Sequence, residues 1–443
     1  MDITINPINK LHGELIAPPS KSYSHRAFIV ASLADGVSVI KNPLTSGDVE
    51  VTINVLKSLG INILKGVENS YVVQKTADSF KSVKESIDCQ NSGTSIRIFS
   101  ALSLIVKEGL SLTGEFLKRN RPIVPLLDAL KYVGAEYKLE KNILLVRRKN
   151  FKCETIKIPG DISSQFITAL LIISPILNCN KKEFIEIELT TPLVSFPYVK
   201  ITLDILNSFG INIQEKLNEK KKGKFIVFCD QKYRPQVYSI PGDFSSAAFI
   251  IAAAVLSPED SNVIIKNLDI ENPQGDKKII EILQGMGAKI EIEKNKNQVS
   301  INGGLKKYPL KGKDIDCSEI PDLFPILSVV GAFASGKTTL YNASNLRLKE
   351  CDRISVMARE LEKMGVKVKE KNDELTIYYC KNLKGLMANH EKDHRIAMAL
   401  CVAALYAENN SEIKNIAIIQ DSYPLFIEDL KKLGANFVEL RNK

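Results

Sequence analysis

Residues 159–164 read Pro159-Gly160-Asp161-Ile162-Ser163-Ser164, and residues 241–246 repeat them almost letter for letter as Pro241-Gly242-Asp243-Phe244-Ser245-Ser246. Each segment leads into a strongly apolar run, 166–173 in the first case and 247–256 in the second. A helix that is apolar on every side must be buried, and Asp and Ser are typical of the residue that caps a helix N-terminus. The near-duplication therefore predicts an internally repeated chain with buried helices.

A second marker shows that the repeat occurs six times. Amphipathic helical segments each end in a glycine and are followed by a β-rich stretch; the glycines are Gly60, Gly134, Gly210, Gly287, Gly365 and Gly434. A glycine just past the last periodic residue is a helix C-cap. Each copy also has a more apolar helix with a polar tip, and the tips lie near 20–22, 91–94, 161–165, 243–246, 320–322 and 393–395.

These markers predict an α/β protein with a two-domain, inside-out, barrel-like fold. It consists of six βαβαββ repeats, three per domain, with parallel buried helices and the sheets outside them. If the buried helices run parallel, their six N-termini face one interdomain cleft. Such a cleft concentrates positive potential and suits a substrate with several negative charges.

The amino-acid composition limits the classes of molecule that the protein is expected to bind. The 443 residues carry a net charge of +9, which favours an anionic partner. The basic residues are interspersed with acids and there is no Trp, so we expect small anionic substrates and no nucleic acid. The eight cysteines lack metal-ligand spacing and indicate reduced, buried thiols of a cytoplasmic protein; they are Cys89, Cys153, Cys179, Cys229, Cys317, Cys351, Cys380 and Cys401. We expect neither export nor membrane insertion.

One motif points to a different chemistry. Residues Gly331 to Thr338 match the nucleotide phosphate-binding pattern G-x-x-x-x-G-K-[ST], which needs a strand before it and a helix after it. In the register of the repeat, however, the motif falls on a turn that leaves an apolar helix and enters a strand. We therefore expect no nucleotide-hydrolysing loop here.

Two stretches concentrate polar chemistry. In Pro18 to Arg26 the prolines favour an extended entry to a helix, whose free N-terminal amides and nearby Lys21 would cradle an anion. In Asn345 to Arg353, a helix that starts near Leu348 would place Glu350 between two cations. A capped surface helix and a solvated salt-bridge ladder are the ordinary alternatives. The recurrence of such polar groups at the tips of the repeats favours a functional site.

The chain resembles the 5-enolpyruvylshikimate-3-phosphate synthase (3-phosphoshikimate 1-carboxyvinyltransferase) family of enolpyruvyl transferases. The motifs that carry the resemblance occur in the family's order and spacing over essentially the whole chain; they are Lys21-Ser22-x-Ser24-x-Arg26, Asn91-Ser92-Gly93-Thr94-x-x-Arg97, Arg121-Pro122-Ile123, Ser163-Ser164-Gln165, Ser195-x-Pro197-Tyr198, Ile320-Pro321-Asp322, Asn345-x-Arg347-x-Lys349-Glu350-x-Asp352-Arg353 and Asp393-His394-Arg395.

The resemblance implies a domain of residues 20–240 and a second domain of residues 1–19 and 241–443, joined by two crossovers, with the active site in a cleft that closes on substrate. The implied reaction transfers the enolpyruvyl group of phosphoenolpyruvate to the 5-hydroxyl of shikimate 3-phosphate and releases phosphate through a tetrahedral intermediate. It belongs to the shikimate pathway, which leads to chorismate and the aromatic amino acids. It needs no metal and no organic cofactor, and we expect a cytoplasmic monomer.

The resemblance also assigns the site residues. Proton transfer falls to the carboxylates Asp322 and Glu350, with Lys21 as a third catalytic residue. Shikimate 3-phosphate would be bound by Lys21, Ser22, Arg26, Ser163, Ser164, Gln165, Ser195, Tyr198, Asp322, Asn345 and Lys349. Phosphoenolpyruvate would be bound by Lys21, Gly93, Arg121, Gln165, Arg353, His394 and Arg395. These residue types suit the ligands, because Arg forks match carboxylates and phosphates, and serines and helix amides accommodate a second phosphate.

The sequence departs from the family at one position. The family usually places a Lys before a Ser/Thr-aromatic-Pro triplet, where it contacts phosphoenolpyruvate, but Asp421 precedes Ser422-Tyr423-Pro424 here. A reversed charge about 4 Å from an anion costs roughly 4 kcal/mol at an effective dielectric of about 20. Asp421 should point away, be offset by a cation or weaken binding. Gly93 leaves room for glyphosate, an inhibitor of the family, so we expect sensitivity.

Two alternatives stay open at this point. The sister enolpyruvyl transferase acts on UDP-N-acetylglucosamine and has the same repeated fold, but its mobile loop usually carries a reactive Cys. The corresponding loop here, Lys118-Arg119-Asn120-Arg121, has none. A non-catalytic protein that binds phosphate or nucleic acid is the other alternative, and it would bind DNA with a steep dependence on salt.

Overall fold

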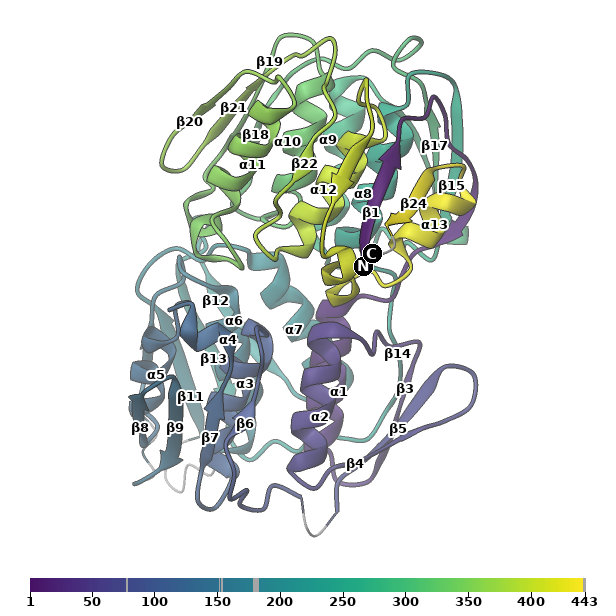
Figure 1. Cartoon of the computed structure of the whole chain (residues 1–443). Coiled ribbons are helices and arrows are strands. Elements are labelled where there is room, and N and C mark those ends of the chain that lie inside the picture. Colours follow the sequence, from purple (N-terminus) through teal and green to yellow (C-terminus); the bar gives the residue numbers. More distant parts are fainter. Residues whose placement is uncertain (77–78, 151, 153, 178–182, 441–443) are drawn as a thin grey trace. The chain divides into compact units, whose positions relative to one another are not determined.

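The computed structural model describes residues 1–76, 79–150, 152, 154–177 and 183–440 (Figure 1). The chain divides into two compact units, which we call unit 1 (Met1–Ser20 and Pro241–Lys443) and unit 2 (Lys21–Ile240). Each unit has its own hydrophobic core. Unit 2 is thus an insertion in the sequence of unit 1.

Six four-stranded sheets, three in each unit, share one topology. In every sheet the first two strands pair in parallel and the other neighbours pair antiparallel. In unit 2 the sheet orders are β14(Val237–Ser239)-β3(Val37–Lys41)-β5(Ser70–Gln74)-β4(Asn62–Lys65), β6(Ile87–Asp88)-β7(Leu110–Thr113)-β9(Ile143–Arg148)-β8(Ala135–Glu140) and β10(Ile156–Ile158)-β11(Phe184–Leu189)-β13(Gly223–Phe228)-β12(Ile213–Leu217). In unit 1 they are β2(His12–Ile16)-β15(Ser261–Lys266)-β17(Gln298–Gly303)-β16(Lys289–Glu293), β18(Asp314–Asp316)-β19(Lys337–Tyr341)-β21(Leu375–Tyr378)-β20(Val368–Glu370) and β22(Met387–Ala388)-β23(Ser411–Ile413)-β1(Asp2–Asn6)-β24(Asn436–Leu440). The predicted six-fold repeat is confirmed.

Each repeat has one inner and one outer helix. The inner helices are almost wholly buried, as their apolar sequences predict; they are α1(Lys21–Leu33), α3(Gly93–Leu102) and α6(Ser164–Ile173) in unit 2, and α8(Phe244–Leu256), α10(Phe324–Phe333) and α12(His394–Ala404) in unit 1. The outer helices are α2(Gly47–Ser58), α5(Val124–Lys131), α7(Phe196–Ser208), α9(Lys278–Met286), α11(Arg353–Lys363) and α13(Phe426–Lys432). The six repeat glycines that follow them all have positive φ, between 80° and 118°, which a side chain would strain.

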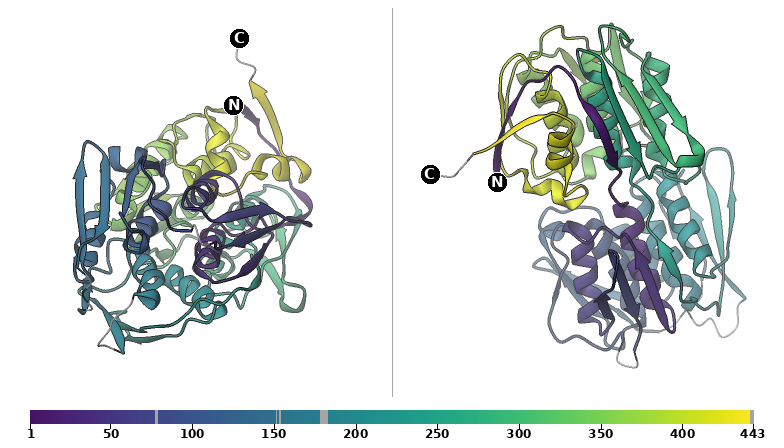
Figure 2. Two further views of the ribbon diagram at one scale, coloured as in Figure 1. Left: turned by 90° about the horizontal axis from the view of Figure 1, so that it is seen from below. Right: turned by 90° about the vertical axis from the view of Figure 1, so that its right-hand side faces the viewer.

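Two strands are exchanged between repeats. Strand β2 directly precedes α1 in the sequence, yet it pairs in parallel with β15 of unit 1. Strand β14 directly precedes α8, yet it pairs in parallel with β3 of unit 2. Strand β1 lies between β23 and β24, and the purple N-terminal strand runs beside the yellow C-terminal strand in Figure 2. Unit 1 is therefore assembled from the two ends of the sequence.

The phosphate-binding pattern at 331–338 falls where the repeat predicts. Helix α10 precedes the turn and strand β19 follows it, which is the reverse of the order that a nucleotide-binding loop needs. The six cysteines in the described ranges are unpaired: Cys89, Cys317 and Cys401 are buried, and Cys229, Cys351 and Cys380 are half-buried. Cys153 and Cys179 lie outside the described residues. Across the described parts of the chain, each helix is too short or too polar to cross a bilayer.

Candidate active site

The N-terminal turn of α1 carries cations in unit 2. Lys21 Nζ lies 3.5 Å from the carboxylate of Asp48, at the start of α2. Arg26, one turn further along α1, is 3% exposed and donates to Thr202 Oγ1 at 2.8 Å, to the Ser22 carbonyl at 2.8 Å and to Thr168 Oγ1 at 3.2 Å. Burial lowers the pKa of its guanidinium to about 10, so Arg26 remains charged at neutral pH. These contacts hold a fixed positive charge near the N-terminal end of α1, where the helix dipole is also positive.

The start of α3 brings three more predicted residues together. A Cβ atom added to Gly93 would lie 3.1 Å from Arg121 Nη2 and 3.3 Å from Gln165 Oε1. Arg121 donates to the Asn91 carbonyl at 2.9 Å, and Gln165 Nε2 donates to Thr94 Oγ1 at 3.0 Å. The structure therefore places Gly93, Arg121 and Gln165, all assigned to phosphoenolpyruvate by resemblance, around one point of unit 2.

Arg97 is a residue to which the sequence analysis gave no role. Its guanidinium donates to Gln165 Oε1 and, through Nη2, to the Pro122 carbonyl at 2.6 Å. It also lies over the ring of Phe116, at 4.9 Å from the centroid. Arg97 thus orients Gln165 and ties α3 to the segment that carries Arg121. Arg97 belongs to the motif Asn91-Ser92-Gly93-Thr94-x-x-Arg97, and this could have indicated its role from the sequence.

The serines assigned to shikimate 3-phosphate lie at two helix starts of unit 2. Ser163 caps α6, with its hydroxyl accepting from the Gln165 amide at 3.3 Å, and Ser164 is the first residue of that helix. Ser195 precedes α7 with φ 54°, a left-handed conformation that is uncommon for serine and clusters at functional sites. Tyr198 lies in the first turn of α7 and is half-buried; its carbonyl accepts from Arg26 at 3.3 Å. The contact joins the α7 start to α1.

Arg353 is the centre of the unit 1 cluster. Its guanidinium is 1% exposed and donates to Asp322 Oδ1 at 2.8 Å, to Asp393 Oδ2 at 2.8 Å and to Glu350 Oε2 at 3.1 Å. Burial opposes ionisation, but the three carboxylates hold the pKa of Arg353 well above its ordinary value. One permanent cation therefore positions Asp322 and Glu350, the two predicted proton-transfer residues.

The loop before α11 corrects one expectation. The helix starts at Arg353, capped by Asp352, and not near Leu348; a 3-10 turn covers Ser344–Leu348 instead. Lys349 and Glu350 are therefore loop residues and do not share a helix face with Arg353. The helix begins where its cap is, and not where the periodicity indicates, because the Asp352 side chain accepts a hydrogen bond from the Ser355 amide.

Asn345 has an oxygen suited to a ligand. It is 6% exposed, and its Oδ1 is buried without a hydrogen-bond partner among the described residues. Such an atom costs free energy unless something binds it.

The start of α12 contributes His394 and Arg395. Arg395 Nη2 lies 3.4 Å from Asp322 Oδ2, so Asp322 is held between Arg353 and Arg395. His394 Nδ1 lies 4.0 Å from Asp421 Oδ2. The carboxylate of Asp421 therefore lies near a histidine that the resemblance assigns to phosphoenolpyruvate.

Asp276 is a second residue that the sequence analysis missed. It is 2% exposed and accepts a hydrogen bond from the Ser245 hydroxyl at the start of α8. Burial, and then the nearby charge of Asp322, raise the pKa of Asp276 to about 7, against opposing effects from Ser245 and Arg395. No repeat marker falls on it, so no sequence pattern distinguished it from a surface acid.

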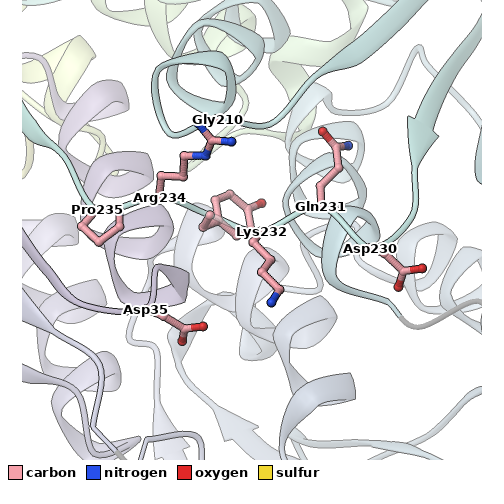
Figure 3. Close-up of a pocket in the computed structure, with 8 residues that line it drawn as sticks. Asp35, Gly210, Asp230, Gln231, Lys232, Arg234 and Pro235 are labelled. Carbon is pink, nitrogen blue, oxygen red and sulfur yellow. The ribbon is translucent and has the colours of Figure 1, made fainter.

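A surface hollow lies elsewhere in unit 2. This cavity of about 560 Å³ is lined by residues 230–235 together with Asp35 and Gly210 (Figure 3). Asp35 follows the C-terminal end of α1, so the hollow lies roughly 20 Å along the helix from Lys21. None of the predicted site residues lines it. We therefore do not assign the chemistry to this hollow.

Each unit thus carries groups suited to small anionic substrates. Unit 2 supplies cations at helix N-termini, and unit 1 supplies carboxylates held by arginines. This is the residue set of an anion-binding group-transfer enzyme.

Comparison with known proteins gives the family. The EPSP synthase (3-phosphoshikimate 1-carboxyvinyltransferase) family matches residues 5–430. The 3-phosphoshikimate 1-carboxyvinyltransferase of Methanocaldococcus jannaschii is 44% identical over 98% of both chains, and that of Clostridium novyi is 38% identical over 96% of both chains. The chain belongs to the EPSP synthase family. Solved structures of EPSP synthase from Acinetobacter baumannii share the fold, with TM-scores of 0.78 and 0.79 at 24% identity over 99% or more of each chain.

Proposed function

We propose that this chain transfers the enolpyruvyl group of phosphoenolpyruvate to the 5-hydroxyl of shikimate 3-phosphate. The products are 5-enolpyruvylshikimate 3-phosphate and phosphate. The observation that carries the proposal is the contact of Arg353 with Asp322 and Glu350, because it holds a proton acceptor and a proton donor on one fixed cation.

The addition step needs two proton transfers. Glu350 gives a proton to the methylene carbon of phosphoenolpyruvate, and the neighbouring carbon becomes open to attack. Asp322 takes the proton of the 5-hydroxyl as its oxygen forms the new C–O bond. The product of this step is a tetrahedral intermediate that carries both phosphates.

The elimination step reverses the role of Glu350. Its carboxylate removes a proton from the new methyl group, the C–O bond to phosphate breaks, and the double bond of the enolpyruvyl ether forms. Arg121, Arg395 and Lys21 would stabilise the carboxylate and the departing phosphate. Holding the two anionic substrates in the correct relative position lowers the activation free energy, by on the order of 7 to 11 kcal/mol for well-oriented reactants.

The remaining assignments belong to the same proposal. Shikimate 3-phosphate is held by the serines at the starts of α6 and α7, by Arg26 and by the buried Asn345 Oδ1. The reaction as written uses no metal or organic cofactor. We further infer a cytoplasmic monomer that binds no nucleic acid.

The test is phosphate release from purified protein. Release should require both shikimate 3-phosphate and phosphoenolpyruvate, and it should collapse in Glu350→Gln. The matched control is Glu362→Gln, an exposed acid on α11, which should retain wild-type turnover. Release that needs UDP-N-acetylglucosamine in place of shikimate 3-phosphate would favour the sister transferase, and release that is indifferent to Glu350 would refute the assigned role.

A further inference from the structure

Four buried polar side chains form a continuous chain through unit 2. His25 Nδ1 on α1 lies 2.7 Å from Thr52 Oγ1 on α2, and Thr52 Oγ1 lies 2.8 Å from Ser95 Oγ on α3. Ser95 Oγ in turn lies 2.8 Å from Ser92 Oγ. All four residues are at most 1% exposed. We call the hydroxyls of Thr52, Ser95 and Ser92 the hydroxyl chain.

The two ends of this chain lie beside predicted substrate contacts. His25 is one turn after Lys21 on α1, and Thr52 is one turn after Asp48 on α2. The His25–Thr52 hydrogen bond and the Lys21–Asp48 ion pair therefore join the same two helices at successive turns. At the other end, Ser92 caps α3 by accepting from the Ser95 amide at 3.2 Å, and the following residue is Gly93. The chain therefore joins the turn of α1 that carries Lys21 to the turn of α3 that starts with Gly93.

The charge state of His25 fits a fixed connection. Burial, and then the charges of Lys21 and Arg26, hold the pKa of His25 well below its ordinary value, and the facing acid Asp48 is paired with Lys21. A neutral imidazole has one N–H, so the tautomer of His25 determines the direction in which hydrogen bonds are donated along the hydroxyl chain.

A purely structural role explains His25 poorly. Its Nε2 is buried and makes no hydrogen bond to a described residue, which costs about 1–3 kcal/mol. A leucine in this apolar core would avoid that cost. A ring nitrogen buried at this cost therefore points to a use other than packing.

We propose that His25 is a positioning residue for the transfer reaction, which acts through the hydroxyl chain to fix Lys21 relative to Gly93. The inference rests on the proposed function, in which Lys21 contacts both substrates and Gly93 contacts phosphoenolpyruvate. Reaction rates respond steeply to this kind of register, since a 1 Å displacement can cost about a hundredfold.

The first test compares two buried serines of α3. Ser95→Ala breaks the hydroxyl chain, whereas Ser100→Ala removes a hydroxyl whose one hydrogen bond to a described residue goes to the Ile96 carbonyl of its own helix. Both residues are fully buried, so the packing cost is matched. We expect Ser95→Ala to lower kcat at least tenfold and Ser100→Ala less than twofold. Equal losses in the two variants would overturn the proposal.

The second test separates positioning from stability at His25 itself. His25→Leu should lower kcat at least tenfold without lowering Tm, because it removes the unpaired nitrogen together with the connection. His25→Asn, whose amide reaches the position of Nδ1, should restore kcat to within about threefold of wild type. Full activity in His25→Leu would overturn the proposal; if that variant does not fold, Thr52→Val breaks the same connection and should show the same loss of kcat.

A spectroscopic measurement tests the connection between His25 and the hydroxyl chain without measuring enzyme activity. In protein labelled with ¹⁵N at its four histidines, the His25 ring should show one tautomer and no titration between pH 6 and 8. Its resonances should shift in Ser92→Ala, at the far end of the chain, and stay in place in Ser100→Ala; the opposite pattern would refute the connection. Wild-type protein that releases no phosphate would refute the proposed function, whereas active wild type with an unaffected Ser95→Ala would refute only the role of His25.

Discussion

Replacing Asp276 by Asn should stabilise the protein, and increasingly so as the pH rises. The native pKa of about 7 lies above the ordinary value of 3.8, so between these values the native state keeps a proton that the unfolded state has lost. The free energy of unfolding contributed by Asp276 is therefore fully present below pH 4 and is lost as the pH rises to 7. About three pH units at about 1.4 kcal/mol each give a loss of about 4 kcal/mol.

Asn resembles the protonated acid and still offers an oxygen to the Ser245 hydroxyl. We expect Asp276→Asn to gain stability over wild type by about 1.4 kcal/mol per pH unit between pH 4 and 7, and to hold an advantage of about 4 kcal/mol at pH 8. Urea unfolding followed by circular dichroism at pH 5, 6, 7 and 8 measures the difference. Asp260→Asn, at an exposed acid of unit 1, controls for the general loss of a negative charge. A difference that does not depend on pH, or that falls toward pH 8, would refute the reasoning.

Three further substitutions test the site. Arg353→Met should destabilise the protein by about 3–5 kcal/mol in thermal unfolding, because Asp393 stays buried without its cation; a loss under about 1 kcal/mol would contradict the Arg353 cluster. Gly93→Ala should raise KM for phosphoenolpyruvate at least tenfold and leave KM for shikimate 3-phosphate within about twofold, since the new methyl group crowds Arg121 at 3.1 Å; equal changes in both would argue against the assignment. Asp421→Lys should lower KM for phosphoenolpyruvate about tenfold. This change in binding free energy is smaller than the roughly 4 kcal/mol of an unscreened charge reversal, because the Asp421 side chain is 26% exposed to solvent. An unchanged KM would mean that Asp421 points away from the ligand.

The fold was predictable from the sequence because its repeat recurs in two independent features. A glycine with positive φ follows each outer helix, and the inner helices are largely apolar and buried, so the period and the buried layer can both be recognised in the sequence. The exchange of β2 and β14 leaves no such mark. Both strands stand directly before an inner helix, and only the pairing partner, hundreds of residues away, distinguishes their sheets.

The site was predictable only in part. Arg121 and Gln165 lie together around Gly93, and Arg353 lies among carboxylates, but the binding roles of these residues stay predictions. Periodicity misplaced the start of α11 because it ignored the cap at Asp352. Asp276 and His25 were missed for a different reason. Each is of interest because of its neighbours in space, and a single Asp in a short 3-10 turn or a single His on a helix carries no sequence pattern of its own.

The insertion of unit 2 within the sequence of unit 1 also sets an order of assembly during synthesis. All three sheets of unit 2 lie between residues 37 and 239, so this unit has every strand it needs once residue 240 has been made. Strand β1 must wait for β23 and β24, more than 400 residues later, and the entropy of closing so long a loop exceeds that of a 25-residue loop by only about 2.5 kcal/mol. The main consequence of the long separation is therefore a delay during synthesis, because the added entropy of loop closure is small. Once unit 1 closes, the inserted unit is tethered to it at both ends, so a single cut in either connection leaves the two covalently joined.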